Sequence, residues 1–367
     1  MSRRTFLRQH LLAAISIFQL LIVNAQIPLP DFRDLVYSKE ISSALVKERS
    51  MVIVHVPDET KDGVRLVGDW QAIAEKAHKA FVTMGVDAIA YINHYDLSVS
   101  PNALSEYSEL FTRRKVKNLI FLIEERKGYS LSIVPFNNKP TLMDNGSVAF
   151  QISDSDLYSV LLQTGIEIRR ADFENENYLI PAKPNYEAGI SIVEKAVLQN
   201  YPGILRRTKL SVERFAEFTV PKEASAETQK EIAEHNQLIQ EQNEELAELT
   251  KRYPYEFELI DPMSDEDLLR SRRQFVLRSV RGKAATLRSL LDFTVREEET
   301  DFVSLIPIMP DQTKAKPISR DALVYKFYVR QNISKNIHIG EWDADLSWQD
   351  ALSNMIGHLI QEHTVDQ

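Results

Sequence analysis

Acidic residues and one histidine follow the predicted strands in the first half of the chain. Asp58 and Asp62 come after the first strand, His94 and Asp96 after the second, and Glu124 ends the third. The carboxyl ends of parallel strands meet at one edge of a sheet, so these side chains could surround one cleft. Carboxylates hold Mg²⁺ or Mn²⁺, and an imidazole moves protons. With His94 and Asp96 as catalytic candidates, such a cleft would suit a metal-dependent hydrolase acting on phosphate esters or nucleotides.

A simpler interpretation of these residues is structural. Residues 58–63 form an ordinary turn sequence, and acidic loop residues are usually solvated. Their spacing is not diagnostic of any metal. His55, inside the first strand, is interpreted as a buried, hydrogen-bonded core residue, and His78, within a helix, as a packing or surface residue. We therefore expect no bound cofactor, with a divalent ion at the five strand-end residues as the alternative.

Several catalytic classes lack their motifs in this sequence. It contains no GxxxxGK[ST] phosphate loop, no GxGxxG after a strand, no GxSxG elbow and no HExxH. It also contains no cysteine, which excludes disulfides, a thiol nucleophile and cysteine-bound iron–sulfur clusters. A non-catalytic role is therefore favoured.

The elements that must position the strand-end residues lie within residues 51–135. Near-continuous apolar runs at 52–54 and 120–123 are typical of strands that are covered on both faces. Segments of helical period separate them, a hairpin is indicated at 125–128, and a helix is predicted at 153–168. The sequence thus predicts an α/β fold whose first domain is a mixed sheet of order βαβαββα.

This order of elements, over about residues 50–168, is similar in topology to the thioredoxin-like arrangement. Another doubly wound sheet remains an alternative. The redox cysteines of the active thioredoxin-like proteins are absent, so the resemblance implies no dithiol chemistry. It is compatible with a protein that keeps only a peptide- or ligand-binding groove.

Residues 1–25 have the three-part layout of a secretory signal peptide. Three arginines in the first eight residues precede an apolar run at 11–23, and small residues precede a cut after Ala25. The apolar run is short for a membrane span. Residues 2–8 resemble the twin-arginine export motif; twin-arginine export, general secretion and a retained anchor all remain open. We expect a soluble periplasmic or secreted bacterial protein with no later transmembrane span.

Length, charge and composition indicate how the rest of the chain is organised. The 367 residues suffice for two domains, predicted at 26–170 and 188–367 with a linker at 171–187. A helix is expected at 31–47. The net charge of −9 argues against binding nucleic acid or anionic membranes.

The second domain is predicted to be a smaller α+β domain with a long polar helix at 223–252. Ile232, Ile239 and Leu246 recur every seven residues, with Leu249 beside them, which indicates a narrow apolar seam for a partner helix or an arm between domains. A short helix is expected at 188–199 and a closing helix at 347–363, with Ser347 and Asp350 as its capping pair. Strands are expected at 210–220, 255–260, 302–309 and 324–330, with a hairpin to 332–339.

A basic helix is predicted at 264–293. Arg270, Arg273, Arg281 and Arg288 would lie on one side of it, opposite an apolar face. Together with the seam, they would form a surface for a protein partner. The leading hypothesis is an exported, non-catalytic binding or assembly component of the cell envelope that meets its partner through helix 223–252.

Overall fold

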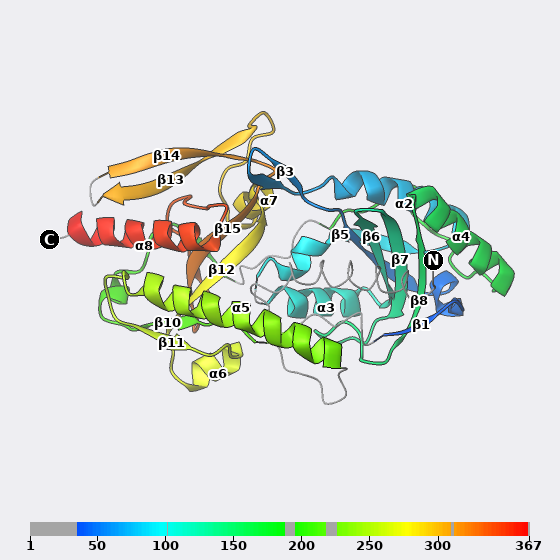
Figure 1. Ribbon diagram of the computed structural model, residues 1–367, viewed down its shortest axis with the longest axis horizontal. Helices are drawn as coiled ribbons and strands as arrows, with labels where there is room; N and C mark the ends of the chain where they lie inside the picture. Colours follow the sequence, from blue (N-terminus) through cyan, green and yellow to red (C-terminus); the bar gives the residue numbers. More distant parts are fainter. Residues whose placement is uncertain (1–34, 101, 188–194, 218–225, 310–311, 366–367) are drawn as a thin grey trace. The chain divides into compact units, whose positions relative to one another are not determined.

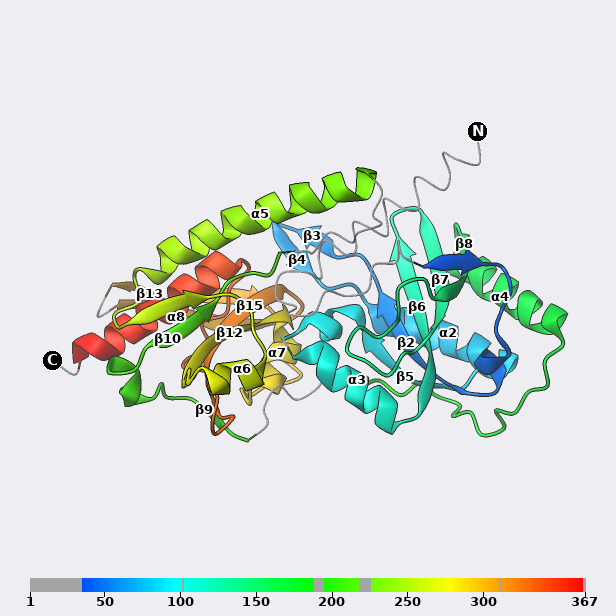
Figure 2. The ribbon, with the colours of Figure 1, turned by 90° about the horizontal axis from the view of Figure 1, so that it is seen from below.

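The computed structural model describes residues 35–100, 102–187, 195–217, 226–309 and 312–365 (Figures 1 and 2). The predicted signal peptide lies outside these ranges. The fold is mixed α/β, as predicted, because both large sheets combine parallel and antiparallel pairs. Contacts divide the chain into two compact units: unit 1 contains described residues 35–60 and 67–187, and unit 2 contains 61–66 and those from 195 onward.

Unit 1 is built on a six-stranded sheet. β2 pairs in parallel with β5 and β6, while β6, β7 and β8 form antiparallel pairs and β1 is parallel to β8. In spatial order the strands are β1 (Val36–Ser38), β8 (Val148–Asp154), β7 (Gly128–Pro135), β6 (Val116–Glu125), β2 (Arg49–His55) and β5 (Ala88–Asn93). The central strands β2 and β6 are the buried apolar runs recognised in the sequence.

Helices cover both faces of this sheet. α2 (Trp70–Met84) and α4 (Leu157–Ala171) pack on one face, where Ala77, Phe81 and Leu161 join Val52 and Val54 in a single core. Asp69 caps the start of α2, and Gly85 ends it with a φ of 77°, which glycine adopts without strain. α3 (Ala103–Arg113) lies on the opposite face, after the 3₁₀ turn η3 (His94–Ser98) (Figure 1).

The predicted order of elements is confirmed in unit 1, with two differences. β8 is an additional strand, so the helix expected from residue 153 begins at Leu157, with Asp156 as its cap. The helix expected at 31–47 is wrong over its described part, which forms β1 and the 3₁₀ turn η2 (Ser43–Val46). Pairing of Tyr37 with Ala149 overrides the local helical pattern.

Residues 172–187 run back along unit 1. Asn177 donates to Gly85 O at 3.0 Å, and the buried His78 places its Nε2 2.8 Å from Pro181 O and its Nδ1 2.9 Å from Tyr91 Oη. Tyr91 N then donates to Asn185 O at 2.8 Å. This segment therefore covers the outer edge of β5, which would otherwise expose unpaired backbone groups.

The described residues of unit 2 form the second six-stranded sheet, a two-stranded ribbon and four α-helices. The sheet order is β11 (Phe257–Ile260), β10 (Leu210–Glu213), β12 (Phe275–Lys283), β15 (Leu323–Gln331), β16 (Ile337–His338) and β9 (Val197–Leu198). The ribbon pairs β13 (Asp301–Met309) with β14 (Gln312–Ser319). The helices are α5 (Ala226–Thr250), α6 (Asp265–Arg270), α7 (Ala284–Leu290) and α8 (Trp348–Val365). β3 (Glu59–Lys61) and β4 (Val64–Leu66) form a small hairpin, and η4 (Gly203–Arg206) is a 3₁₀ turn.

The core of unit 2 lies between its sheet and α8. Leu352 and Ile356 of α8 pack with Phe275 and Val329 of the sheet, and Leu246 of α5 joins them. Ser347 and Asp350 form the predicted capping pair of α8: Asp350 N donates to Ser347 Oγ at 3.1 Å, and that hydroxyl donates to Asp350 Oδ2 at 2.8 Å. No helix within the described ranges combines the length and the apolar character needed to cross a membrane.

The prediction of a basic helix at 264–293 is wrong. Its residues form the short helix α6, the strand β12 and the short helix α7. All nine residues of β12 pair antiparallel with β15, from Phe275 with Gln331 to Lys283 with Leu323. β-branched Val276 and Val280 fit a strand as well as a helical stripe, and this long pairing selects the strand. In the helix expected at 188–199, residues 188–194 lie outside the described part and residues 197–198 form β9.

Candidate functional site

Four polar side chains meet where β2 and β5 end. His55 Nδ1 lies 2.9 Å from His94 Nδ1, and the two rings meet edge to face at 4.0 Å. Tyr95 Oη donates to Asp58 Oδ2 at 2.5 Å. We call His55, His94, Tyr95 and Asp58 the strand-end cluster. Both histidines and Tyr95 are buried and Asp58 is half-buried, and η3 itself contributes His94 and Tyr95 to the cluster.

Burial sets the charge state of this region. Loss of solvation lowers the pKa of His55 to about 4, against the opposing charge of Asp58. His55 is therefore neutral at neutral pH. Loss of solvation also raises the pKa of Asp96 to about 7, opposed by a hydrogen bond from the Asn93 backbone. That bond and the Asn93 side chain form the capping box of η3, so Asp96 stabilises the turn that carries His94.

Only Asp58 and His94 of the five predicted strand-end residues belong to this cluster. Glu124 accepts a hydrogen bond from Tyr129 Oη at 2.9 Å on the α2 and α4 face. His55 follows Val54 of that core, and successive strand residues face opposite sides, so His55 points to the other face. Asp62 is exposed in the turn between β3 and β4 and belongs to unit 2.

The carboxylates at the strand ends accept hydrogen bonds from other groups of the protein. Asp58 binds Tyr95, Asp96 caps η3 and Glu124 binds Tyr129. Across the part of the chain that the structure describes, no three His, Asp or Glu side chains are grouped so that they could hold a metal ion. The pairing of His55 with His94 agrees with the interpretation of His55 as a hydrogen-bonded core residue. His55 and Tyr95 were not among the site residues predicted from the sequence. Only their positions at the ends of neighbouring strands could have indicated that they belong to the cluster.

Replacing His55 with glutamine is expected to weaken the acid sensitivity of unit 1. The pKa of His55 is about 4 in the folded chain, below its ordinary value of 6.5. Between these two pH values His55 binds a proton in the unfolded chain and not in the folded chain, so the free energy of unfolding falls as the pH drops from 6.5 to about 4. Denaturation in urea at about pH 7 and about pH 4.5 should show His55→Gln losing roughly 2 kcal/mol less than the wild type between the two. Asp96 acts in the opposite direction, so the difference between the proteins is the readout. A Tyr95→Phe control should keep the wild-type pH dependence of the unfolding free energy. If His55→Gln lost as much stability as the wild type between the two pH values, the lowered pKa of His55 would be contradicted.

The apolar seam of α5 is buried within this chain. Ile232, Ile239 and Leu246 are all buried, and Leu249 packs against the core that contains Leu246. Asn243, on the same side of the helix, binds the backbone of Phe215: Phe215 N donates to Asn243 Oδ1 at 2.7 Å, and Asn243 Nδ2 donates to Phe215 O at 3.0 Å. The seam is therefore covered by this protein's own residues, which corrects the expectation that it is open to a partner.

The outward face of α5 is exposed and acidic. Leu238 is 56% exposed on it. Near it are the exposed acidic residues Glu234, Glu241, Glu244, Glu245 and Glu248. Lys230 and Lys251 each pair with one of these acids, Glu234 at 3.5 Å and Glu248 at 2.5 Å. We call this surface the α5 outward face.

The four arginines predicted to line one helix face lie on separate elements. Arg270 at the end of α6 pairs with Glu266 at 2.6 Å, and Arg273, in the loop after it, pairs with Glu258 at 3.0 Å. The other two contact aromatic rings: Arg281 lies 5.3 Å from the Tyr325 ring centre, and Arg288 lies 4.7 Å from that of Phe302 and 5.0 Å from that of Trp342. They form no shared basic surface.

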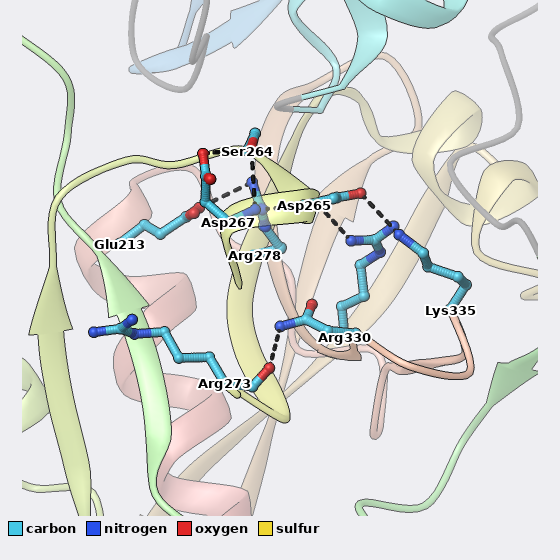
Figure 3. A network of polar contacts seen from close by, with 9 residues as sticks. Glu213, Ser264, Asp265, Asp267, Arg273, Arg278, Arg330 and Lys335 are labelled. Atoms are coloured by element: carbon cyan, nitrogen blue, oxygen red, sulfur yellow. Dashed lines mark hydrogen bonds and ion pairs between the residues drawn. The ribbon is translucent and has the colours of Figure 1, made fainter. Parts of the chain in front are cut away.

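Asp265 of α6 is the centre of a polar network that joins α6 to β12, β15 and β10 of unit 2 (Figure 3). Its carboxylate lies 2.7 Å from Arg330 Nη1, 3.1 Å from Lys335 Nζ and 3.5 Å from Arg278 Nη2. Arg278 also pairs with Glu213 at 2.9 Å. Burial alone would raise the pKa of Asp265, but hydrogen bonds from Arg330 and Lys335 and the charge of Arg278 lower it. The network stabilises the sheet.

Two features thus remain as candidates for function: the buried, internally bonded strand-end cluster in unit 1 and the exposed acidic α5 outward face in unit 2. Comparison with models of known protein families, with curated proteins and with solved structures finds no match to the chain.

Proposed function

We propose that the protein is an exported, non-catalytic binding or assembly component of the bacterial cell envelope. The observation that carries this proposal is the α5 outward face: Ile232, Ile239 and Leu246 on the apolar side of the helix are buried, while exposed carboxylates lie beside the exposed Leu238. The signal-peptide layout of residues 1–25 supports export.

The chemistry of the α5 outward face indicates the kind of partner. Acidic side chains that repeat along a helix give a negative potential that attracts a basic surface and speeds its association. Leu238 supplies an exposed apolar contact beside these acids, and apolar contacts carry much of the binding energy of protein interfaces. The proposed partner is therefore a protein with a basic groove or patch.

The strand ends of unit 1 support a non-catalytic role. A hydrolytic metal site needs carboxylates that are free to bind the ion, and Asp58, Asp96 and Glu124 are each engaged by a protein donor. The divalent-ion alternative has no comparable observation in its favour.

Reversing charges on α5 tests the proposal. The variant Glu241→Lys/Glu244→Lys/Glu248→Lys should reduce recovery of the partner by roughly tenfold when tagged protein is purified from envelope fractions. A matched control reverses three exposed acids of unit 1, Glu40, Glu109 and Glu174. Equal recovery with the α5 variant, or equal loss with the control, would contradict a role for this face.

A further inference from the structure

α4 exposes a stripe of large apolar side chains. Tyr158 is 73% exposed, Leu162 42% and Ile166 38%, and residues four apart lie on the same face of a helix. The opposite face carries Leu157, Val160, Leu161 and Ile168 into the core of unit 1. We call Tyr158, Leu162 and Ile166 the α4 stripe. It is an apolar strip on the solvent side of a helix whose inner side is already packed.

Charges of opposite sign flank the two ends of the stripe. Asp156 caps the N-terminus of α4 and is exposed, while Arg169 and Arg170 are exposed in its last turn. When two copies of α4 lie antiparallel with Leu162 at the two-fold axis, Tyr158 of one copy comes opposite Ile166 of the other. Asp156 then lies opposite the last turn of the second helix, which carries Arg169. A parallel arrangement would place like charges together at both ends.

We propose that the α4 stripe is the contact between two copies of this chain, packed antiparallel about a two-fold axis at Leu162. In this arrangement the charged ends and the apolar positions of the stripe each meet their counterpart, as a symmetric contact requires. Apolar side chains at four-residue spacing are the ridges that pack into the grooves of a second helix. This contact is independent of the α5 outward face, so its failure would leave the proposed function intact.

The expected dimer is weak. One face of a 15-residue helix is small beside the roughly 800 Å² that each partner buries in a standard stable interface. The net charge of −9 also opposes association of two copies. A dissociation constant in the micromolar range, on the order of 10 µM, is therefore expected.

Cysteine trapping tests both the contact and its direction. The chain has no cysteine, so a single introduced thiol gives no background disulfide. In the purified full chain, Leu162→Cys should form a covalent dimer under mild oxidation, because the two side chains meet at the axis. Tyr158→Cys and Ile166→Cys should each cross-link poorly alone, since each residue and its own copy lie about 12 Å apart along the helices, yet efficiently when mixed.

Three outcomes would overturn the proposal. One is cross-linking of Leu162→Cys no faster than that of Leu238→Cys, an exposed leucine on α5. The second is self-linking of Tyr158→Cys and Ile166→Cys as efficient as their mixture, which would indicate a parallel contact. The third is sedimentation of the wild type as a monomer up to about 200 µM. The proposal expects the wild type to associate within this range, Leu162→Glu to sediment as a folded monomer, and Leu238→Glu to behave as the wild type.

Discussion

Lys326→Met is expected to lower the free energy of unfolding by about 3–5 kcal/mol. Lys326 and Asp343 are both fully buried, and Lys326 Nζ lies 2.7 Å from Asp343 Oδ1. Nζ also donates to the carbonyl oxygens of Ile339 at 2.5 Å and Phe327 at 3.0 Å. Removing the ammonium group leaves a buried carboxylate without its counter-charge. Urea denaturation followed by circular dichroism measures the loss.

The pH dependence of this variant has a defined sign. Burial raises the pKa of Asp343, and the charge of Lys326 opposes the rise. A carboxyl group whose pKa is raised on folding binds a proton more readily in the folded state, so its contribution to stability is largest at low pH and is lost as pH rises through the raised value. Without Lys326 the pKa should rise further, and Lys326→Met should recover stability on acidification.

The double variant Lys326→Met/Asp343→Leu is the matched control. It removes both charges and should be more stable than the single variant, because no uncompensated charge stays buried. A single variant within about 0.5 kcal/mol of the wild type, or a double variant no better than the single one, would contradict the importance of the pair.

Asp265→Ala is expected to cost about 3 kcal/mol of unfolding free energy. The change removes the carboxylate that contacts both buried arginines, Arg278 and Arg330, while the pair of Arg278 with Glu213 remains (Figure 3). Because the pKa of Asp265 is lowered in the folded state, its contribution is present above the ordinary value of 3.8 and is lost as pH falls through the lowered value. The variant should therefore lose less stability in acid than the wild type, as measured by urea denaturation at several pH values.

Glu266→Ala supplies the control for this prediction. Glu266 is the next residue in α6, and its ion pair with Arg270 is exposed on both sides. Exposed pairs contribute roughly 0–1 kcal/mol, so this variant should stay close to the wild type. Equal effects of the two substitutions would show that Asp265 matters only as a helix residue.

Much of unit 1 could be predicted from sequence because its strands have distinct patterns. β2 and β6 are apolar at nearly every position, which is typical of strands buried on both faces. β8 was missed because three of its last four residues, Gln151, Ser153 and Asp154, are polar and lead directly into a helix cap. β1 was missed because three residues carry no period of their own, and its pairing with β8 determines its conformation.

The sites were harder to predict than the strands. The contact of His55 with His94 depends on the register of β2 against β5, which residue types alone do not fix. Val276 and Val280 fitted the apolar side of a helix equally well, since residues four apart lie on one side of a helix and also on one face of a strand. The seam of α5 was recognised, but whether its partner was another chain or this one could be learned only from the fold.

Photo-crosslinking from α5 in living cells is the most direct measurement of the proposed function. A photoreactive amino acid placed at Leu238, which is 56% exposed on the α5 outward face, should give a discrete adduct with one envelope protein that has a basic surface. The same group at the exposed Ile333 should not give this adduct, and charge reversal at Glu241, Glu244 and Glu248 should abolish it. No adduct from position 238 beyond that from position 333 would contradict a partner at this face.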